Sequence, residues 1–335
     1  MSRSRLTVVL SQAQGKHPAR RALEESVVAA LLMEPGLDVS VVPYLYDLGP
    51  DHTGRLFLES IPGDMVVLAW MYPRAAFWVL DRDGIKGRFG ESRLRPPADE
   101  DGEESGEPEP PKGIGAVGVP DRWIYCLDLR DFNNHDPYVQ EVRRIAEECR
   151  QRREAKAPPT LVQLGVSLAA EKPAAAPTFT PEQLLQQPGR RWYPVIDYSR
   201  CTNCMECIDF CLFGVYGVDG QDRIFVENQD SCKKGCPACS RVCPEHAIIF
   251  PDYKTPAIAG APVGSVSGLK IDLTKLFGGA DAIQIAAQER DRELVADGRQ
   301  AVGLTVGIPK RQADRVQGPK DDLDKLMDSL DALEL

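Results

Sequence analysis

Apolar positions along the first 150 residues follow two alternating patterns. Short runs rich in Val, Ile and Leu predict buried strands at residues 5–12, 37–46, 64–71 and 121–132. Apolar residues at helical spacing predict helices at residues 17–36, 53–61, 73–83 and 136–152. Strands that alternate with helices form parallel sheets covered on both faces. Residues 1–152 are therefore predicted to form an α/β domain with a mostly parallel sheet.

The pattern changes within and after this domain. Residues 96–112 are acidic and rich in Pro and Gly, which predicts a solvated loop, and the Ala-Pro pairs of residues 153–190 predict a semi-extended linker. Residues 254–335 are predicted to form a second linker and an extended helical tail, with one helix at 280–298. Leucines at helical spacing in residues 319–335 make that segment a candidate for docking on a partner, although it could also fold back or stay in solution.

Length, charge and hydropathy limit the class of protein. A chain of 335 residues predicts two or three domains, and a net charge of −10 argues against nucleic-acid binding. The apolar window at 65–80 is short and contains Pro73 and Arg74, so no membrane insertion is expected. The apolar run Leu6 to Leu10 is too short for a secretory signal, which predicts a cytoplasmic protein. In a reducing compartment, clustered cysteines indicate metal binding rather than disulfides.

Eight of the ten cysteines stand in two short rows. The first row, CTNCMECIDFC, has gaps of two, two and three residues, and the second row, CKKGCPACSRVCP, has gaps of three, two and three. Residues 192–253, which contain both rows and a predicted hairpin at 215–228, resemble a bacterial-type ferredoxin domain with two [4Fe-4S] clusters. The resemblance covers about a fifth of the chain and implies a small α+β domain, assigned to residues 191–253.

The resemblance implies that each row gives its last cysteine to the other cluster. One [4Fe-4S] cluster would be held by Cys201, Cys204, Cys207 and Cys243. The other would be held by Cys232, Cys236, Cys239 and Cys211. Zinc sites and disulfides are the alternatives for these cysteines, and purely structural clusters are the alternative to redox-active ones.

Two departures from the ferredoxin pattern concern the second cluster site. Leu212 follows Cys211 where the family often has proline, and one extra residue separates Cys232 from Cys236. Gly235 is expected to adopt an unusual backbone angle that lets this longer loop still ligate a cluster.

Charged residues beside the rows are candidates for tuning a cluster or for docking an acidic partner. These are Arg200, Lys233, Lys234 and Arg241, and ordinary solvated side chains are the alternative reading. His246 is a candidate for tuning the first cluster, although capping or packing of a turn is favoured.

Other motifs indicate less specific chemistry. The run GIGAVG at 113–118 matches a dinucleotide fingerprint by letter, but it lacks the strand before it and the helix after it, so a flexible entry to a strand is favoured. The loops at 11–17 (with Gly15 and Lys16) and 131–136 form a candidate ligand crevice if their strands are close, with ordinary turn chemistry as the favoured alternative. The crevice residues of the second loop are Asp131, Asn133, Asn134 and His135. Cys126 and Cys149 are expected to be buried spectators.

The combined pattern predicts an iron–sulfur electron-transfer protein or subunit that passes electrons through two [4Fe-4S] clusters to a partner oxidoreductase. Two alternatives stay open. One is a redox enzyme with a substrate or flavin site in the N-terminal domain, and the other is a binding protein that senses oxidants through its clusters. No catalytic residue is assigned.

Overall fold

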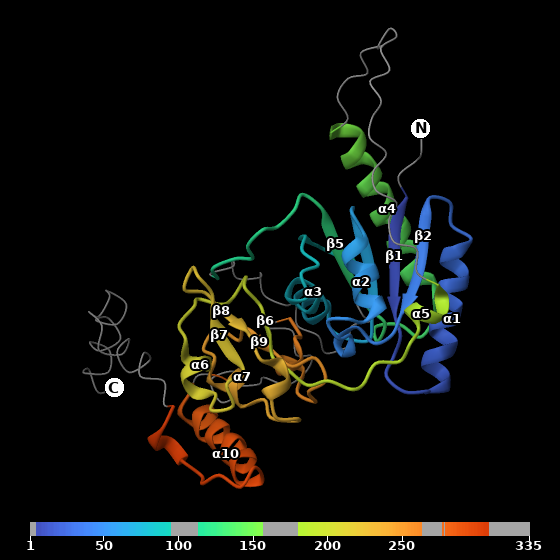
Figure 1. The fold of residues 1–335 in the computed structure, drawn as a ribbon. Helices are drawn as coiled ribbons and strands as arrows, with labels where there is room; N and C mark the ends of the chain where they lie inside the picture. Colours follow the sequence, from blue (N-terminus) through green and yellow to red (C-terminus); the bar gives the residue numbers. More distant parts are fainter. Residues whose placement is uncertain (1–4, 95–112, 157–179, 263–276, 278, 308–335) are drawn as a thin grey trace, which may run out of the picture.

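The structure is a computed structural model that describes residues 5–94, 113–156, 180–262, 277 and 279–307. The acidic loop 96–112, most of the predicted linker 153–190 and the leucine-rich segment 319–335 lie outside the described residues. Figure 1 shows a helix-covered sheet, a smaller lobe that contains both cysteine rows, and a helix below that lobe. Within the described residues, none of the helices has the length and apolar character needed to cross a bilayer.

The N-terminal sheet has five parallel strands, which confirms the predicted α/β domain. The strand order is β2-β1-β3-β5-β4. The strands are β1 (Leu6–Ser11), β2 (Leu37–Val42), β3 (Met65–Ala69), β4 (Arg88–Gly90) and β5 (Trp123–Asp128). All five residues of β3, at the centre of the sheet, are buried, as expected for a strand covered on both faces.

The predicted strand boundaries need two corrections. The strand predicted at 37–46 ends at Val42, because Pro43 cannot donate to the ladder and the chain then turns into the 3-10 helix η1 (Leu45–Asp47). The edge strand β4 was not predicted, since three residues are too few to give an alternating pattern.

Helices cover both faces of this sheet (Figure 1). One face packs against α1 (Pro18–Leu32) and α4 (Asp136–Lys156), and the other packs against α2 (Thr53–Ser60) and α3 (Pro73–Arg82). Prolines begin α1 and α3, where the missing N–H costs nothing. The helix α4 is longer than predicted and extends into residues assigned to the linker.

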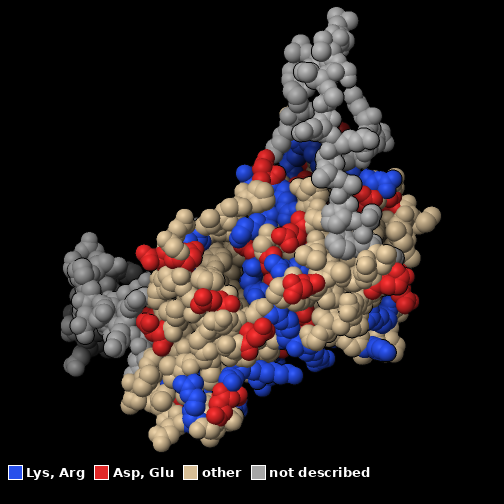
Figure 2. All heavy atoms as spheres, in the orientation of Figure 1, with Lys and Arg blue, Asp and Glu red and all other residues tan. Residues whose placement is uncertain are grey.

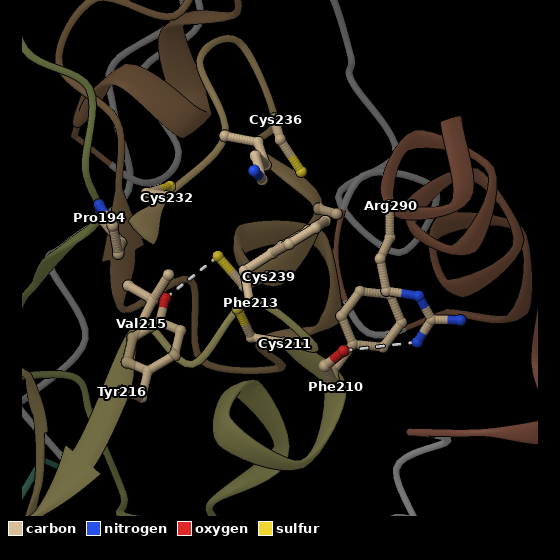
Figure 3. A pocket seen from close by; sticks show the side chains of 12 residues that line it. Pro194, Phe210, Cys211, Phe213, Val215, Tyr216, Cys232, Cys236, Cys239 and Arg290 are labelled. Carbon is tan, nitrogen blue, oxygen red and sulfur yellow. Dashed lines mark hydrogen bonds between the residues drawn. The ribbon is translucent and has the colours of Figure 1, made fainter. Parts of the chain in front are cut away.

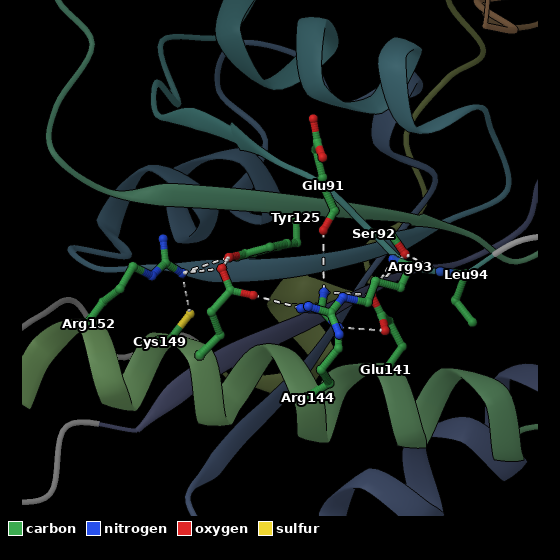
Figure 4. Close-up of polar contacts among 10 residues, drawn as sticks. Glu91, Ser92, Arg93, Leu94, Tyr125, Glu141, Arg144, Cys149 and Arg152 are labelled. Carbon is green, nitrogen blue, oxygen red and sulfur yellow. Dashed lines mark hydrogen bonds and ion pairs between the residues drawn. The ribbon is translucent and has the colours of Figure 1, made fainter. Parts of the chain in front are cut away.

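A network of charged side chains joins α4 to the sheet (Figure 4). Arg152 donates to the Tyr125 hydroxyl at 2.6 Å and lies 3.2 Å from the Cys149 sulfur. Burial raises the pKa of the Cys149 thiol to about 12 and raises that of Cys126 as well. Both cysteines are buried, as predicted, and neither thiol is activated.

The cysteine lobe is built from short elements around its own apolar core. A predicted hairpin is present as β7 (Tyr216–Val218) and β8 (Ile224–Val226), which pair antiparallel. The remaining elements are β6 (Val195–Ile196), α6 (Glu206–Phe210), η2 (Gln229–Ser231), α7 (Ala238–Val242), β9 (Ile248–Ile249) and α8 (Pro256–Ala259). β6 pairs with β9, which brings the two ends of the lobe together.

The cysteine lobe packs directly on the α/β domain. Val195 and Ile249 join the apolar core on the α3 side of the sheet. Tyr193 exchanges hydrogen bonds with Tyr46, and both side chains are buried. The short helix α5 (Pro181–Leu184), inside the predicted linker, lies against α2. The described part of the linker is therefore docked rather than free.

The predicted helix at 280–298 is present as α10 (Ala280–Ala296) and is followed by the 3-10 helix η3 (Gly303–Thr305). α10 packs against α7 of the cysteine lobe. Figure 2 shows Lys and Arg atoms along the middle of one face, between the two parts of the molecule, and again over α10 at the bottom.

Candidate metal centre

The eight clustered cysteines line two separate cavities. The cysteines that line one cavity form one set. The first cysteine set is Cys201, Cys204, Cys207 and Cys243. The second cysteine set is Cys211, Cys232, Cys236 and Cys239 (Figure 3). Each cavity is thus lined by three cysteines of one row and the last cysteine of the other, which is the grouping that the ferredoxin resemblance implies.

The same local structure carries the last cysteine of each row away from its neighbours. α6 and α7 each have five residues, and each ends at a cysteine with an extended backbone. Cys211 has φ −78° and ψ 107°, and Cys243 has φ −69° and ψ 113°. The chain therefore leaves the helix at the same point in both rows, and the last thiol faces the opposite cavity.

Left-handed residues let the rows curl around the cavities. Asn203 and Gly235, each directly before the second cysteine of its row, have φ of 59° and 86°. Gly235 was expected to supply such an angle, and the structure confirms it. The extra residue of the second row lies in the turn at Lys233 and Lys234, closed by a hydrogen bond from the Cys236 amide to the Lys233 carbonyl at 3.0 Å.

Burial dominates the acid–base state of the thiols. It raises the pKa of Cys207 and Cys239, and the other members of each set raise it further. Burial also raises the pKa of Cys243 and Cys236 to about 12 each. These shifts favour the protonated thiols in the absence of a metal, whereas a bound metal centre would favour the thiolates.

Hydrogen bonds reach the sulfurs from different sources in the two sets. The Tyr216 hydroxyl donates to the Cys239 sulfur at 3.1 Å, and both groups are buried (Figure 3). The Ala247 amide donates to the Cys243 sulfur at 3.3 Å. Such donors favour negative charge on sulfur and so raise the potential of a metal–thiolate centre.

The lining of the cavities fits a metal–sulfur cluster better than a single ion. Four sulfurs surround each open space, and the second cavity is otherwise lined by apolar groups, Lys233 and Arg290. In the part of the chain that the structure describes, no three His, Cys, Asp or Glu side chains converge closely enough to hold one metal ion. Four thiolates around one space are the ligand set that iron–sulfur clusters use.

The first set is supported by the α/β domain. Arg74, at the start of α3, donates to the Asp197 carboxylate at 2.5 Å and to the His246 carbonyl at 2.6 Å. Asp197 accepts the Cys201 amide on its own carbonyl, and His246 lies three residues after Cys243. Arg74 therefore joins the two chain segments that hold Cys201 and Cys243.

Residues 113–118 also contact the first set. The amides of Gly113, Ile114 and Gly115 donate at 2.8 Å to the carbonyls of Ser199, Cys201 and Tyr198. A Cβ on Gly113 would overlap the Tyr198 carbonyl, so the close approach requires glycine. The predicted flexible entry to β5 is therefore a fixed contact with the first cysteine row.

The second set is supported by α10. Arg290 of α10 lines the second cavity and is almost fully buried. Arg241 pairs with Glu289 at 2.9 Å, and Lys233 pairs with Asp297 at 2.6 Å. The other two basic candidates differ: Arg200 donates to the Glu245 carbonyl at 2.8 Å, and Lys234 is exposed.

His246 packs against the ring of Phe277, in agreement with the favoured prediction. It has φ 52°, and its ring lies 4.2 Å from that of Phe277.

The structure separates the two loops of the predicted ligand crevice. β3 lies between β1 and β5, so the loops at 11–17 and 131–136 do not leave neighbouring strands. Gln14 instead bonds Asp47 at 3.0 Å and Asp252 of the cysteine lobe at 2.9 Å. In the second loop, His135 lies 3.4 Å from Asp136, while burial and the nearby Asp128 raise the pKa of Asp131 to about 6. These contacts agree with turn and interface chemistry.

Three supporting features were not predicted: Arg74, Arg290 and the contact of residues 113–118. Arg74 and Asp197 are 123 positions apart in the chain, and no local pattern marks such a pair. The glycines of residues 113–118 are evident in the sequence, but they do not show which segment the backbone approaches closely.

Comparison with known proteins gives one match. A segment of 66 residues, 19% of the chain, is 52% identical to a protein described as an uncharacterized ferredoxin of Methanocaldococcus jannaschii. The chain contains a ferredoxin-like segment. The match spans 44% of that relative, less than half of its length. No family model matches the chain, and no solved structure matches it.

Proposed function

We propose that this chain is an iron–sulfur electron-transfer protein that holds two [4Fe-4S] clusters, one in each cysteine set. The observation that carries the proposal is the division of the eight cysteines between two cavities, each completed by a sulfur from the opposite row. The ferredoxin-like match supports the same type of cofactor. The clusters would supply one-electron redox chemistry at low potential.

In this proposal the chain's own residues shield and tune the two centres. The buried thiols exclude water, and the Tyr216 hydroxyl and the Ala247 amide stabilise negative charge on sulfur. Because each row supplies its last cysteine to the other set, the two centres lie close together, which favours electron transfer between them. A partner oxidoreductase would deliver or accept the electron. A reducing compartment such as the cytoplasm would keep the thiols free for iron.

The direct test is anaerobic purification of the full chain, followed by iron and sulfide counts and EPR during stepwise reduction. Two [4Fe-4S] clusters require about eight iron and eight sulfide ions per chain and give two interacting signals. Zinc in place of iron, or iron without a reversible signal, would contradict the proposal.

Two matched variants test the exchange of last cysteines. Cys243→Ser removes one sulfur from the first set, and Cys211→Ser removes one from the second set. Each variant is expected to impair a different centre and to lower the iron content from about eight toward about four per chain. The EPR signal that survives in one variant should be the signal that the other loses. Loss of the same signal in both variants would refute the grouping.

A further inference from the structure

The helix α10 lies outside both cysteine rows but forms a wall of the second cavity. Arg290 lines this cavity beside Phe210 and Cys211 (Figure 3). Its side chain is 1% exposed, and its guanidinium lies 4.4 Å from the centre of the Phe210 ring. A positive charge is therefore held inside the protein next to the second set.

Neutral groups make most of the hydrogen bonds to Arg290. Its guanidinium donates to the carbonyls of Val306 at 3.0 Å and Gly303 at 2.6 Å, with a longer bond to Phe210 at 3.4 Å. The carboxylate of Asp291 accepts at 3.2 Å. These contacts fix the guanidinium but leave more of its charge uncompensated than a short carboxylate pair would.

Arg74 at the first set provides the contrast. Its guanidinium forms a 2.5 Å ion pair with Asp197, which is 2% exposed, so the two charges largely cancel. Among the residues that the structure describes, the acidic partner of Arg290 is Asp291, the adjacent residue on its own helix, at the longer distance of 3.2 Å. Of these two arginines, Arg290 therefore presents the less compensated charge to its cysteine set.

Acidic residues of α10 act in the opposite direction. Glu289 is paired with Arg241, and Glu293 lies 3.6 Å from the exposed Arg292. Both glutamates interact electrostatically with Cys236, whereas Arg290 interacts with Cys211. α10 thus presents both signs of charge to one cavity, and single substitutions can separate them.

We propose that α10, through the buried charge of Arg290, raises the reduction potential of the second centre above that of the first. This inference rests on the proposed function. A reduced donor protein would be oxidised by one electron, which would pass through the first centre without net change there and reduce the second centre by one electron, and an acceptor protein would then remove it from the second. Arg290 acts as a positioning and tuning residue, because a nearby cation favours the more negative, reduced state.

The test is an EPR-monitored redox titration of the full chain and three variants. Arg290→Met should shift the reduction equilibrium of the second centre about tenfold toward the oxidised form, or about 59 mV for a one-electron couple. Arg290→Lys should retain most of the wild-type potential, because it keeps the charge. Glu293→Gln should shift the second centre in the opposite direction, and the first centre should change little in all three.

The outcomes separate this inference from the function on which it rests. Equal shifts in Arg290→Lys and Arg290→Met would mean that shape matters rather than charge, and an unchanged potential in Arg290→Met would also overturn the inference. If Arg290→Met loses iron, Glu293→Gln still gives the sign with which a charge on α10 shifts the second centre, and a lower potential in that variant would overturn the inference. A wild-type chain that fails to bind iron would refute the proposed function instead.

Discussion

The two cysteine sets have the same internal design but different neighbours. Both use a five-residue helix to carry the last cysteine to the opposite cavity, and both place a left-handed residue before the second cysteine of the row. The first set is supported from the α/β domain by Arg74 and by the amides of residues 113–115. The second is enclosed by α10 and its buried Arg290.

This difference shows that an internally repeated module can acquire unequal halves from outside. The ligand rows alone predict two nearly equivalent sites. The differences come from segments far away in the chain. The first set lies beside the Arg74–Asp197 ion pair, whose charges compensate each other, and the second set lies beside Arg290, whose charge is less compensated. Inequality between the two sites is what a directional transfer of electrons requires.

Removal of Arg74 should have the largest effect on this comparison. Arg74→Met leaves the buried Asp197 carboxylate without its partner, which typically costs about 3–5 kcal/mol. We expect a lower free energy of unfolding in denaturant titration and a loss of iron from the first centre before the second. The double variant Arg74→Met with Asp197→Asn should recover part of the stability. A single variant as stable as the wild type would show that the α/β domain does not support the first set.

Substitution of Gly113 should have a medium effect, also confined to the first set. Gly113→Ala forces a Cβ against the Tyr198 carbonyl and should cost about 1–3 kcal/mol as the backbone shifts. Faster release of iron from the first centre in the presence of a chelator would report the change. Gly63→Ala is the matched control, because a Cβ there meets no atom within 4 Å. Equal behaviour of the two variants would contradict a tight contact at Gly113.

The smallest effect is expected for the hydrogen bond from the Tyr216 side chain to the second set. Tyr216→Phe removes the hydroxyl that donates to the Cys239 sulfur. A change of about 0.5–1 kcal/mol is typical of one hydrogen bond, and it should shift the second centre about two- to fivefold toward the oxidised form. The redox titration should show no change in the first centre, whose Cys243 sulfur accepts from the Ala247 amide. A shift of equal size in both centres would argue against a local effect.

The sequence allowed the repeating elements to be predicted but not their long-range contacts. Apolar periodicity predicted four of the five parallel strands, the longer gap between Cys232 and Cys236 predicted the left-handed Gly235, and residues 215–228 predicted the hairpin between the rows. Strand order was out of reach, so the proximity of the loops after β1 and β5 stayed a condition, and the structure places β3 between their strands. Arg74 and Arg290 carry no local signal, since an arginine on a helix becomes special only through what it packs against.

The contact between residues 113–118 and the first cysteine row has a consequence for biosynthesis. Residues 113–118 leave the ribosome well before their partners at 198–201. These hydrogen bonds of the α/β domain therefore cannot form until the first cysteine row has been synthesised. The contact gains its final hydrogen bonds only when the loop at Cys201 has taken shape. A chain in which that loop has not folded would leave the amides of Gly113, Ile114 and Gly115 without these partners.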